Sequence, residues 1–162
     1  MIRPINIYPN DQLAKIAEHC EPLEDNLDLE QDDTRIWPKE LEDLIEDMKE
    51  TLAHSGGIGL ASNQIWDKDK NPPAVFVIKV GSEIQEVINP KIKLTGKPVD
   101  IEEGCLSRPG YFKKMRRKQN LEIWYQTLAS KEVNVAKFYY VSHGIIPVVI
   151  QHEVDHLEGK VI

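Results

Sequence analysis

The segment Gln151-His152-Glu153-Val154-Asp155-His156 carries the sharpest signal in the sequence. On an α-helix, residues four apart lie on the same face, so His152 and His156 can offer two imidazoles to one metal ion. Glu153, beside the first histidine, can reach a metal-bound water and act as a general base. The alternative is an ordinary exposed, charged helix face, because a pattern with three fixed positions also occurs by chance.

The residues before this segment favour the metal-binding interpretation over the exposed helix face. Ile145, Val148 and Val149 extend the histidine-bearing face as an apolar stripe, which predicts that the helix is packed inside the domain. Buried imidazoles need polar partners, since burying an unpaired polar group is costly. A hydrogen bond in the core explains one such histidine, but it explains two at metal-ligand spacing less easily.

A catalytic zinc site has three protein ligands and one open position. In thermolysin-like peptidases the third ligand is a downstream glutamate, whereas this sequence ends at Ile162, soon after His156. We therefore expect the third ligand upstream. Cys105, in Glu103-Gly104-Cys105-Leu106-Ser107, is the best candidate because a thiolate binds Zn²⁺ and Fe²⁺ well. The other options are His19, His54 and His143.

The composition narrows the class of protein. The length of 162 residues fits one domain, and 41% hydrophobic with 29% charged residues is typical of a soluble globular protein. A net charge of −7 argues against a general nucleic-acid binder, and the basic cluster at 113–118 is interpreted as a solvated hairpin end, with a polyanion site as the alternative. No apolar run could span a membrane, and the N-terminus lacks a secretory signal. Two cysteines, Cys20 and Cys105, indicate a reducing cytoplasm, with a disulfide between them as the alternative.

The hydrophobic pattern predicts helices first, then strands, then one late helix. This order is typical of the α+β class, with antiparallel or mixed sheets, rather than of an alternating α/β fold. Helices are expected at 10–19, from Pro38 to Gly56, and at 142–157 with its start or a kink near Pro147. An exposed acidic loop is expected at 21–34, and strands at 74–80, 84–89, 98–103, 120–127 and 132–140.

Three motifs, in order, resemble those of the peptide deformylase family, which have the forms GxGLAAxQ, EGCLS and HExDHLxG. This chain has Gly57-Ile58-Gly59-Leu60-Ala61-Ser62-Asn63-Gln64, then Glu103-Gly104-Cys105-Leu106-Ser107, then His152-Glu153-Val154-Asp155-His156-Leu157-Glu158-Gly159. Ser62 stands where alanine is usual, and Phe112 where many members have an arginine. The resemblance covers essentially the whole chain, as one catalytic domain at 1–162, and implies sheets packed around a central helix that bears HExxH.

The resemblance also implies the roles of individual residues. Cys105, His152 and His156 would hold the metal, with Glu153 catalytic. Gln64, through its side-chain amide, and Leu106, through its backbone N–H, would stabilise the negative charge that develops on the substrate oxygen. Glu103 and Arg117 would form a supporting ion pair. The substrate pocket would be lined by Gly57, Ile58, Gly59, Ile101, Leu106, Ile145, Val148 and Val149, for which a helix stop or plain core packing is the alternative.

The same resemblance implies a substrate, a cofactor and partners. The substrate would be the N-formylmethionyl end of a nascent peptide, and the product formate. The cofactor would be one divalent metal ion, Fe²⁺ in the native enzyme, with Zn²⁺, Ni²⁺ or Co²⁺ as alternatives. We expect a monomer that lies in the bacterial cytoplasm and makes transient contact with the ribosome. The sequence ends before the C-terminal helix that is usual in the family, as in phage-encoded forms. The alternative location is therefore the cytoplasm of an infected host cell. The rival predictions are a zinc metallopeptidase of HExxH type and a non-catalytic, metal-stabilised binding domain.

Overall fold

A computed structural model of the chain describes residues 1–24 and 36–162. Residues 25–35 hold most of the expected acidic loop at 21–34, so that prediction lies largely outside the described residues. Within the described part, no helix is both long enough and apolar enough to cross a membrane.

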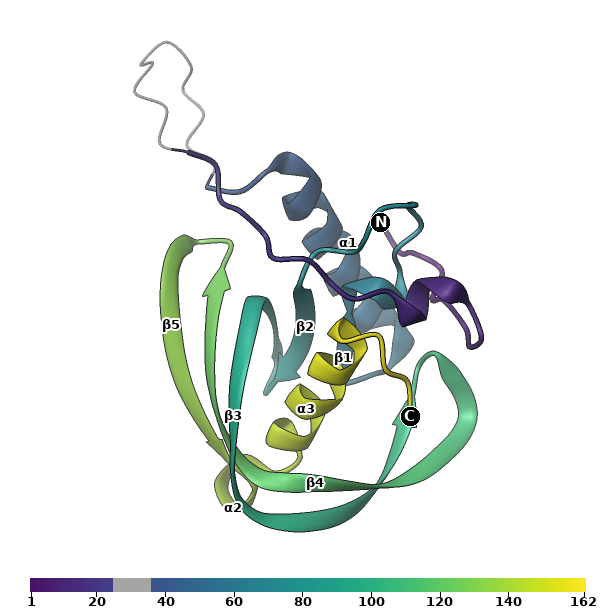
Figure 1. The fold of residues 1–162 in the computed structure, drawn as a ribbon, viewed down its shortest axis with the longest axis vertical. Helices are drawn as coiled ribbons and strands as arrows, with labels where there is room; N and C mark the ends of the chain where they lie inside the picture. Colours follow the sequence, from purple (N-terminus) through teal and green to yellow (C-terminus); the bar gives the residue numbers. More distant parts are fainter. Residues whose placement is uncertain (25–35) are drawn as a thin grey trace.

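The described strands form one antiparallel sheet in which each strand pairs with its neighbour in the sequence (Figure 1). Its order is β1 (Gly59–Ala61), β2 (Val75–Val80), β3 (Glu83–Cys105), β4 (Arg108–Thr127) and β5 (Ser130–Tyr139). The register of β3 on β4 shifts at Ile88/Lys91, Thr95/Pro98 and Gly104/Cys105. Such irregularities bend and twist a strand, and Figure 1 shows β3 and β4 as one long, strongly curved hairpin.

Helix α1 (Lys39–Ser55) confirms the helix expected after Pro38. Leu44, Met48 and Leu52 recur at helical spacing and are buried, so one face of the helix packs on the sheet and the other stays in solvent. Gly56, with φ of 74°, ends the helix in the left-handed conformation that glycine adopts without strain. The core beneath α1 consists of Cys20, Trp37, Leu41, Leu44, Ile45, Met48, Leu52, Leu60, Ile65, Trp66, Val75, Val77 and Ile88.

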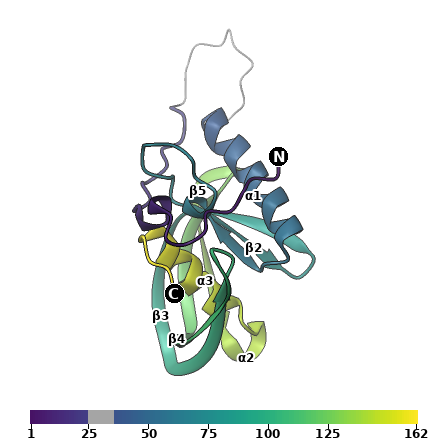
Figure 2. The ribbon, with the colours of Figure 1, turned by 90° about the vertical axis from the view of Figure 1, so that its right-hand side faces the viewer.

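The last part of the chain forms two helices rather than the single helix predicted at 142–157. The short α2 (Tyr140–His143) ends at Gly144, whose φ of 57° breaks the helical path. Helix α3 (Ile146–Leu157) begins there with Pro147 in its first turn, a position that needs no backbone N–H. Helix α3 packs against β1, β2 and β4, and Figures 1 and 2 show it along the inner side of the curved hairpin.

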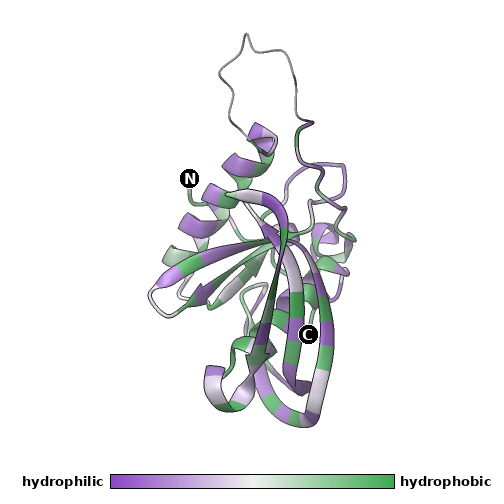
Figure 3. Cartoon of the chain, turned by 90° about the vertical axis from the view of Figure 1, so that its left-hand side faces the viewer, coloured by the Kyte–Doolittle hydropathy of each residue, from purple (hydrophilic) through white to green (hydrophobic). Residues whose placement is uncertain are grey.

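Three further sequence predictions change. The helix at 10–19 is only a 3-10 turn, η1 (Asp11–Ala14), because from Lys15 onward the backbone is extended and bonds other segments, with Ala17 donating to Leu157 and Glu18 bridging to Pro73. The strands expected at 84–89 and 98–103 are parts of one continuous β3, since bulges absorb the proline and glycine positions. The basic cluster at 113–118 lies within β4, not at a hairpin end. Figure 3 shows hydrophobic and hydrophilic bands alternating along the strands, as expected for a sheet with one buried face.

Candidate metal centre

Cys105, His152 and His156 come together at the end of β3. The Sγ atom of Cys105 lies 3.2 Å from Nε2 of His156, and that nitrogen lies 3.2 Å from Nε2 of His152. The three possible ligand atoms lie within 4.8 Å of one another. Metal–ligand bonds of about 2.0–2.3 Å in a tetrahedron place ligand atoms roughly 3.3–3.6 Å apart, so this donor set fits a divalent transition metal. Both cysteines are free thiols, which excludes the alternative of a Cys20–Cys105 disulfide.

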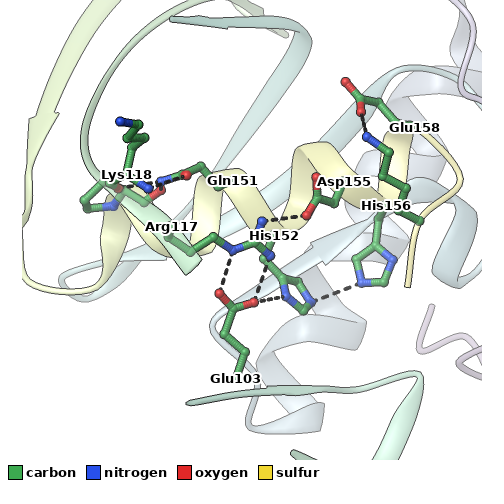
Figure 4. A network of polar contacts seen from close by, with 10 residues as sticks. Glu103, Arg117, Lys118, Gln151, His152, Asp155, His156 and Glu158 are labelled. Carbon is green, nitrogen blue, oxygen red and sulfur yellow. Dashed lines mark hydrogen bonds and ion pairs between the residues drawn. The ribbon is translucent and has the colours of Figure 1, made fainter. Parts of the chain in front are cut away.

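A buried chain of charged groups orients the first histidine (Figure 4). Nδ1 of His152 lies 2.9 Å from Oε2 of Glu103. Arg117 donates to both oxygens of Glu103, at 2.7 and 2.9 Å, and to Oδ2 of Asp155 at 2.6 Å. The expected Glu103–Arg117 ion pair is therefore present, and Asp155, three residues after His152 on α3, extends it. A carboxylate on the second nitrogen fixes the ring and leaves Nε2 free to bind a metal.

The local charges favour a cation between these side chains. Burial lowers the pKa of His152, but hydrogen bonds with Cys105 and Glu103 and the charge of Glu153 outweigh it and raise this pKa to about 10. Burial also raises the pKa of Glu103, yet Arg117 and His152 lower it to about 2. Burial, with the charges of His152 and Arg117, lowers the pKa of His156 to about 3, so this imidazole is neutral, whereas metal binding would require His152 to give up the proton that its raised pKa retains.

Glu153 lies beside the candidate ligands in a buried position. Its side chain is 3% exposed, and its Oε2 atom has no hydrogen-bond partner among the described residues. Burial raises the pKa of Glu153 to about 7, with smaller opposing effects of His152 and Arg117. A Cβ on Gly59 would lie 2.8 Å from the carboxyl carbon of Glu153, so strand β1 passes directly over this carboxyl group. The carboxyl group can therefore take up a proton near neutral pH and has a free oxygen for it.

Gln64 reaches the same centre from η2 (Ser62–Gln64), and its amide orientation is fixed. Its Oε1 accepts a hydrogen bond from the backbone N–H of Ala61 at 2.9 Å. Its Nε2 therefore faces the other way, 3.0 Å from Oγ of Ser107 and 3.7 Å from Sγ of Cys105. The side chain is 1% exposed. It can thus present an N–H donor beside the candidate metal ligands.

The residues predicted for the substrate pocket fall into two groups. Gly57 faces the side chain of Leu106, so the segment directly before β1 and the residues around Cys105 approach each other closely. Ile58 and Ile145 are each 40% exposed, which leaves their side chains free to contact a ligand. Ile101 and Val149 are half-buried and Val148 is buried. A common methionine pocket built from these residues stays a prediction.

Sequence reasoning gave no role to four buried or half-buried side chains that support the centre. Ser107 is hydrogen-bonded to Gln64, Asp155 holds Arg117, Gln151 binds the backbone of β4, and the amide of Asn63 donates to the backbone oxygen of His156. Three of them lie within the three motifs and Gln151 lies directly before the third, but their partners are 33 to 93 residues away in the sequence. Periodicity and spacing give no signal for such contacts.

Comparison with known proteins identifies the family. The model of the polypeptide deformylase family matches residues 2–162. A peptide deformylase of Fusobacterium nucleatum is 34% identical over 161 residues, which cover 98% of this chain and 80% of the relative. A peptide deformylase of Hahella chejuensis is 38% identical over 118 residues, or 72% of this chain and 67% of the relative.

Solved structures show the same fold. The crystal structure of peptide deformylase from Thermotoga maritima matches with a TM-score of 0.77 and 29% identity, over 98% of this chain and 93% of that one. A peptide deformylase from Synechococcus elongatus, in complex with actinonin, matches with a TM-score of 0.77 and 27% identity, over 97% and 74% of the two chains. With a family match over nearly its full length and this fold, the chain belongs to the polypeptide deformylase family.

Proposed function

We propose that this deformylase hydrolyses the formyl group of N-formylmethionyl peptides with Cys105, His152 and His156 as metal ligands and Glu153 as the proton-transfer group. The observation that carries the assignment is the meeting of three elements at one point. The end of β3 brings Cys105, α3 brings both histidines and Glu153, and η2 brings Gln64. Family membership supports the reaction, and this geometry supports the roles of the residues.

The deformylase family is metal-dependent, and the three ligand atoms fit one ion with an open fourth position. When bound, a divalent metal would make water more acidic and polarise the formyl carbonyl. Glu103 and Arg117 would keep the ring of His152 turned toward this ion. The unpartnered oxygen of Glu153 supports the fit, because a buried carboxylate oxygen next to the centre needs a polar group such as a water molecule.

The residues of the chain divide the reaction between them. Glu153 takes a proton from the attacking water and delivers it to the leaving amine nitrogen. The oxygen of that water forms a bond to the formyl carbon and the formyl C–N bond breaks, so formate and a free methionyl N-terminus leave. The amide N–H of Gln64 and the backbone N–H of Leu106 would donate to the oxygen that becomes negatively charged. Gly57 and Gly59 leave room for groups of the chain itself, because the space that a Cβ would take is filled by Leu106 and by Glu153.

Fe²⁺ is the proposed native metal, with Zn²⁺, Ni²⁺ and Co²⁺ able to occupy the same donor set. Cys105 is only half-buried, so oxygen can reach the thiolate and its ion. We therefore expect the iron-loaded enzyme to lose activity in air faster than the nickel-loaded enzyme. Parallel incubations in air and under nitrogen, sampled for activity, would measure this. Equal lifetimes of both forms in air would contradict it.

The deciding experiment measures formate release from a short formyl-Met peptide by the metal-loaded wild type, Glu153→Ala and Cys105→Ala. The wild type should release formate, Glu153→Ala should bind metal but lose roughly 10²-fold or more in rate, and Cys105→Ala should lose the metal. No formate release by the wild type would refute the proposed reaction. A Glu153→Ala enzyme with full rate would refute the role of Glu153, and cleavage of internal peptide bonds would favour a metallopeptidase.

A further inference from the structure

Gln151, the residue before the first candidate histidine, binds the backbone of β4 at two points. Its Nε2 donates to the backbone oxygen of Lys118 at 2.8 Å, and its Oε1 accepts from the backbone N–H of Lys118 at 3.0 Å. Nε2 also donates to the backbone oxygen of Pro147 at 2.9 Å, one turn earlier on α3. Gln151 is 4% exposed, and all the polar atoms of its side chain are used.

This contact lies where the sheet edge would otherwise be unpaired. Strand β5 pairs with β4 as far as Tyr139, which lies opposite Asn120. Beyond that point the chain leaves the sheet to form α2. Two residues before Asn120 on β4, the side-chain amide of Gln151 exchanges both hydrogen bonds with Lys118, as the next residue of a neighbouring strand would do. The side chain of Gln151 on α3 thus pairs with the backbone of β4 at the point where β5 no longer does.

The position of this contact ties it to the candidate metal centre (Figure 4). Lys118 follows Arg117, which holds Glu103, and Glu103 holds His152, which follows Gln151. Two neighbouring residues of β4 are therefore linked to two neighbouring residues of α3. Arg117 also binds Asp155 of α3 directly at 2.6 Å, so the pairing of Gln151 with Lys118 adds an anchor closer to the start of the helix. A turn of the helix by one residue would rotate its side chains by about 100°, and these anchors together oppose such a turn and fix the axial position of α3.

We propose that Gln151 is a positioning residue for the metal centre: by pairing with the backbone of Lys118 it registers α3 on β4, so that His152 and His156 meet Cys105. The inference rests on the proposed function and assigns Gln151 no contact with substrate or metal. It predicts that the amide, rather than the mere filling of space, matters. It also predicts that the Lys118 side chain is dispensable, because Gln151 binds only the backbone of that residue.

The test loads the full chain with Co²⁺ and records both its visible spectrum, which reports thiolate ligation and coordination geometry, and its affinity by competition with a chelator. Gln151→Met keeps the size of the side chain but makes no such hydrogen bonds, and should weaken Co²⁺ binding about 10-fold or more, with altered absorption bands. Gln151→Glu keeps only the acceptor for the N–H of Lys118 and should also weaken binding. It serves as the second variant if Gln151→Met does not fold.

Two controls separate positioning from general stability. Ile150→Ala removes a buried side chain of the same helix, which packs in the core with Phe76 and Leu121. It should lower the melting temperature and keep the wild-type Co²⁺ spectrum. Lys118→Ala should leave both spectrum and affinity unchanged. A wild-type spectrum and affinity in folded Gln151→Met or Gln151→Glu would overturn the inference alone, whereas a wild type without a cobalt–thiolate band would overturn the proposed metal centre itself.

Discussion

The Nδ1 atom of His152 and the Oε2 atom of Glu103 lie 2.9 Å apart, so a residue of β3 orients a candidate ligand on α3. Glu103 stands two residues before Cys105, which places the two contributions of β3 side by side. Strand β3 therefore supplies one candidate ligand, Cys105, and orients another, His152. This relationship makes Glu103 the first residue to test.

We expect Glu103→Gln to weaken metal binding about 10–100-fold, since the amide keeps the shape but loses the charge that orients His152 and pairs with Arg117. Chelator competition with the metal-loaded protein measures the change. Glu102→Gln, in the neighbouring exposed position of β3, is the control. Equal metal affinity of Glu103→Gln and the control would contradict the orienting role.

Gly59→Ala should reduce the rate of formate release about 10²-fold while the protein keeps its metal. Gly59 does not have a left-handed backbone, so alanine strains no φ angle there, but its methyl group would collide with the carboxyl group of Glu153. Steady-state kinetics and metal content, measured on the same preparation, separate the two effects. Ser82→Ala, in the exposed β2–β3 turn, should change neither quantity. A Gly59→Ala enzyme with normal kcat would show that Glu153 is not held in place by β1.

Gln64→Met should lower kcat roughly 10²-fold or more and leave metal affinity nearly unchanged, if the amide N–H stabilises the developing oxyanion. Ser107→Ala is the informative comparison. It removes the hydroxyl at 3.0 Å from Nε2, while the bond from the N–H of Ala61 to Oε1 still fixes the direction of the amide. Its effect on kcat should therefore be much smaller. If the two variants lose kcat equally, Ser107 has more than a supporting role.

The features that could be predicted from the sequence are those with a periodic hydrophobic pattern and those that lie within a motif. Leu44, Met48 and Leu52 reveal α1 because a buried helix face recurs every three to four residues. The break between α2 and α3 at Gly144 was not predicted, since a glycine inside a helical pattern is compatible with a continuous helix. The continuous β3 was missed because Asn89-Pro90 and Gly96 are typical of turns, whereas the sheet accommodates them as irregularities of register.

Some residues of the candidate centre could be predicted from the sequence, and others could not. The spacing of His152 and His156 follows from helix geometry, and Cys105 followed in part from the motif around it. The support from Gln151 and Asp155 could not be predicted, since their partners lie on β4, more than thirty residues earlier in the sequence. Only the pairing of β4 with β3 and the packing of α3 bring these residues together.

A contact outside the centre predicts the pH dependence of stability. Burial raises the pKa of Glu86, but the Lys49 ammonium and backbone N–H groups, including that of Leu128, outweigh it and hold this pKa below its usual value. A lowered folded-state pKa stabilises the protein above the unfolded-state pKa of about 4.3, and this stabilisation is lost as the pH falls. Glu86→Gln should thus cost about 1 kcal/mol at pH 7 and flatten the decline of the melting temperature in acid.

Melting temperatures of wild type and Glu86→Gln, taken from pH 7 down to pH 3, measure this contribution. Glu83→Gln, at an exposed position of the same strand, is the control and should follow the wild type. If Glu86→Gln and the wild type lose the same stability between these pH values, the Lys49–Glu86 pair does not contribute to acid unfolding.

Removing the metal should lower the melting temperature, because the candidate ligands join the end of β3 to α3 and bind an ion only in the folded state. At a free metal concentration of about 100 times Kd the expected stabilisation is about 2.7 kcal/mol.

The two cysteines offer a matched comparison. Cys105→Ser should greatly reduce the metal-dependent rise in melting temperature. Cys20→Ser removes a buried thiol from the core below α1, so it should lower the melting temperature with and without metal but keep the difference between them. Thermal unfolding of the three proteins, each with chelator and with added Co²⁺, decides the point, and a rise of wild-type size in Cys105→Ser would exclude Cys105 as a ligand.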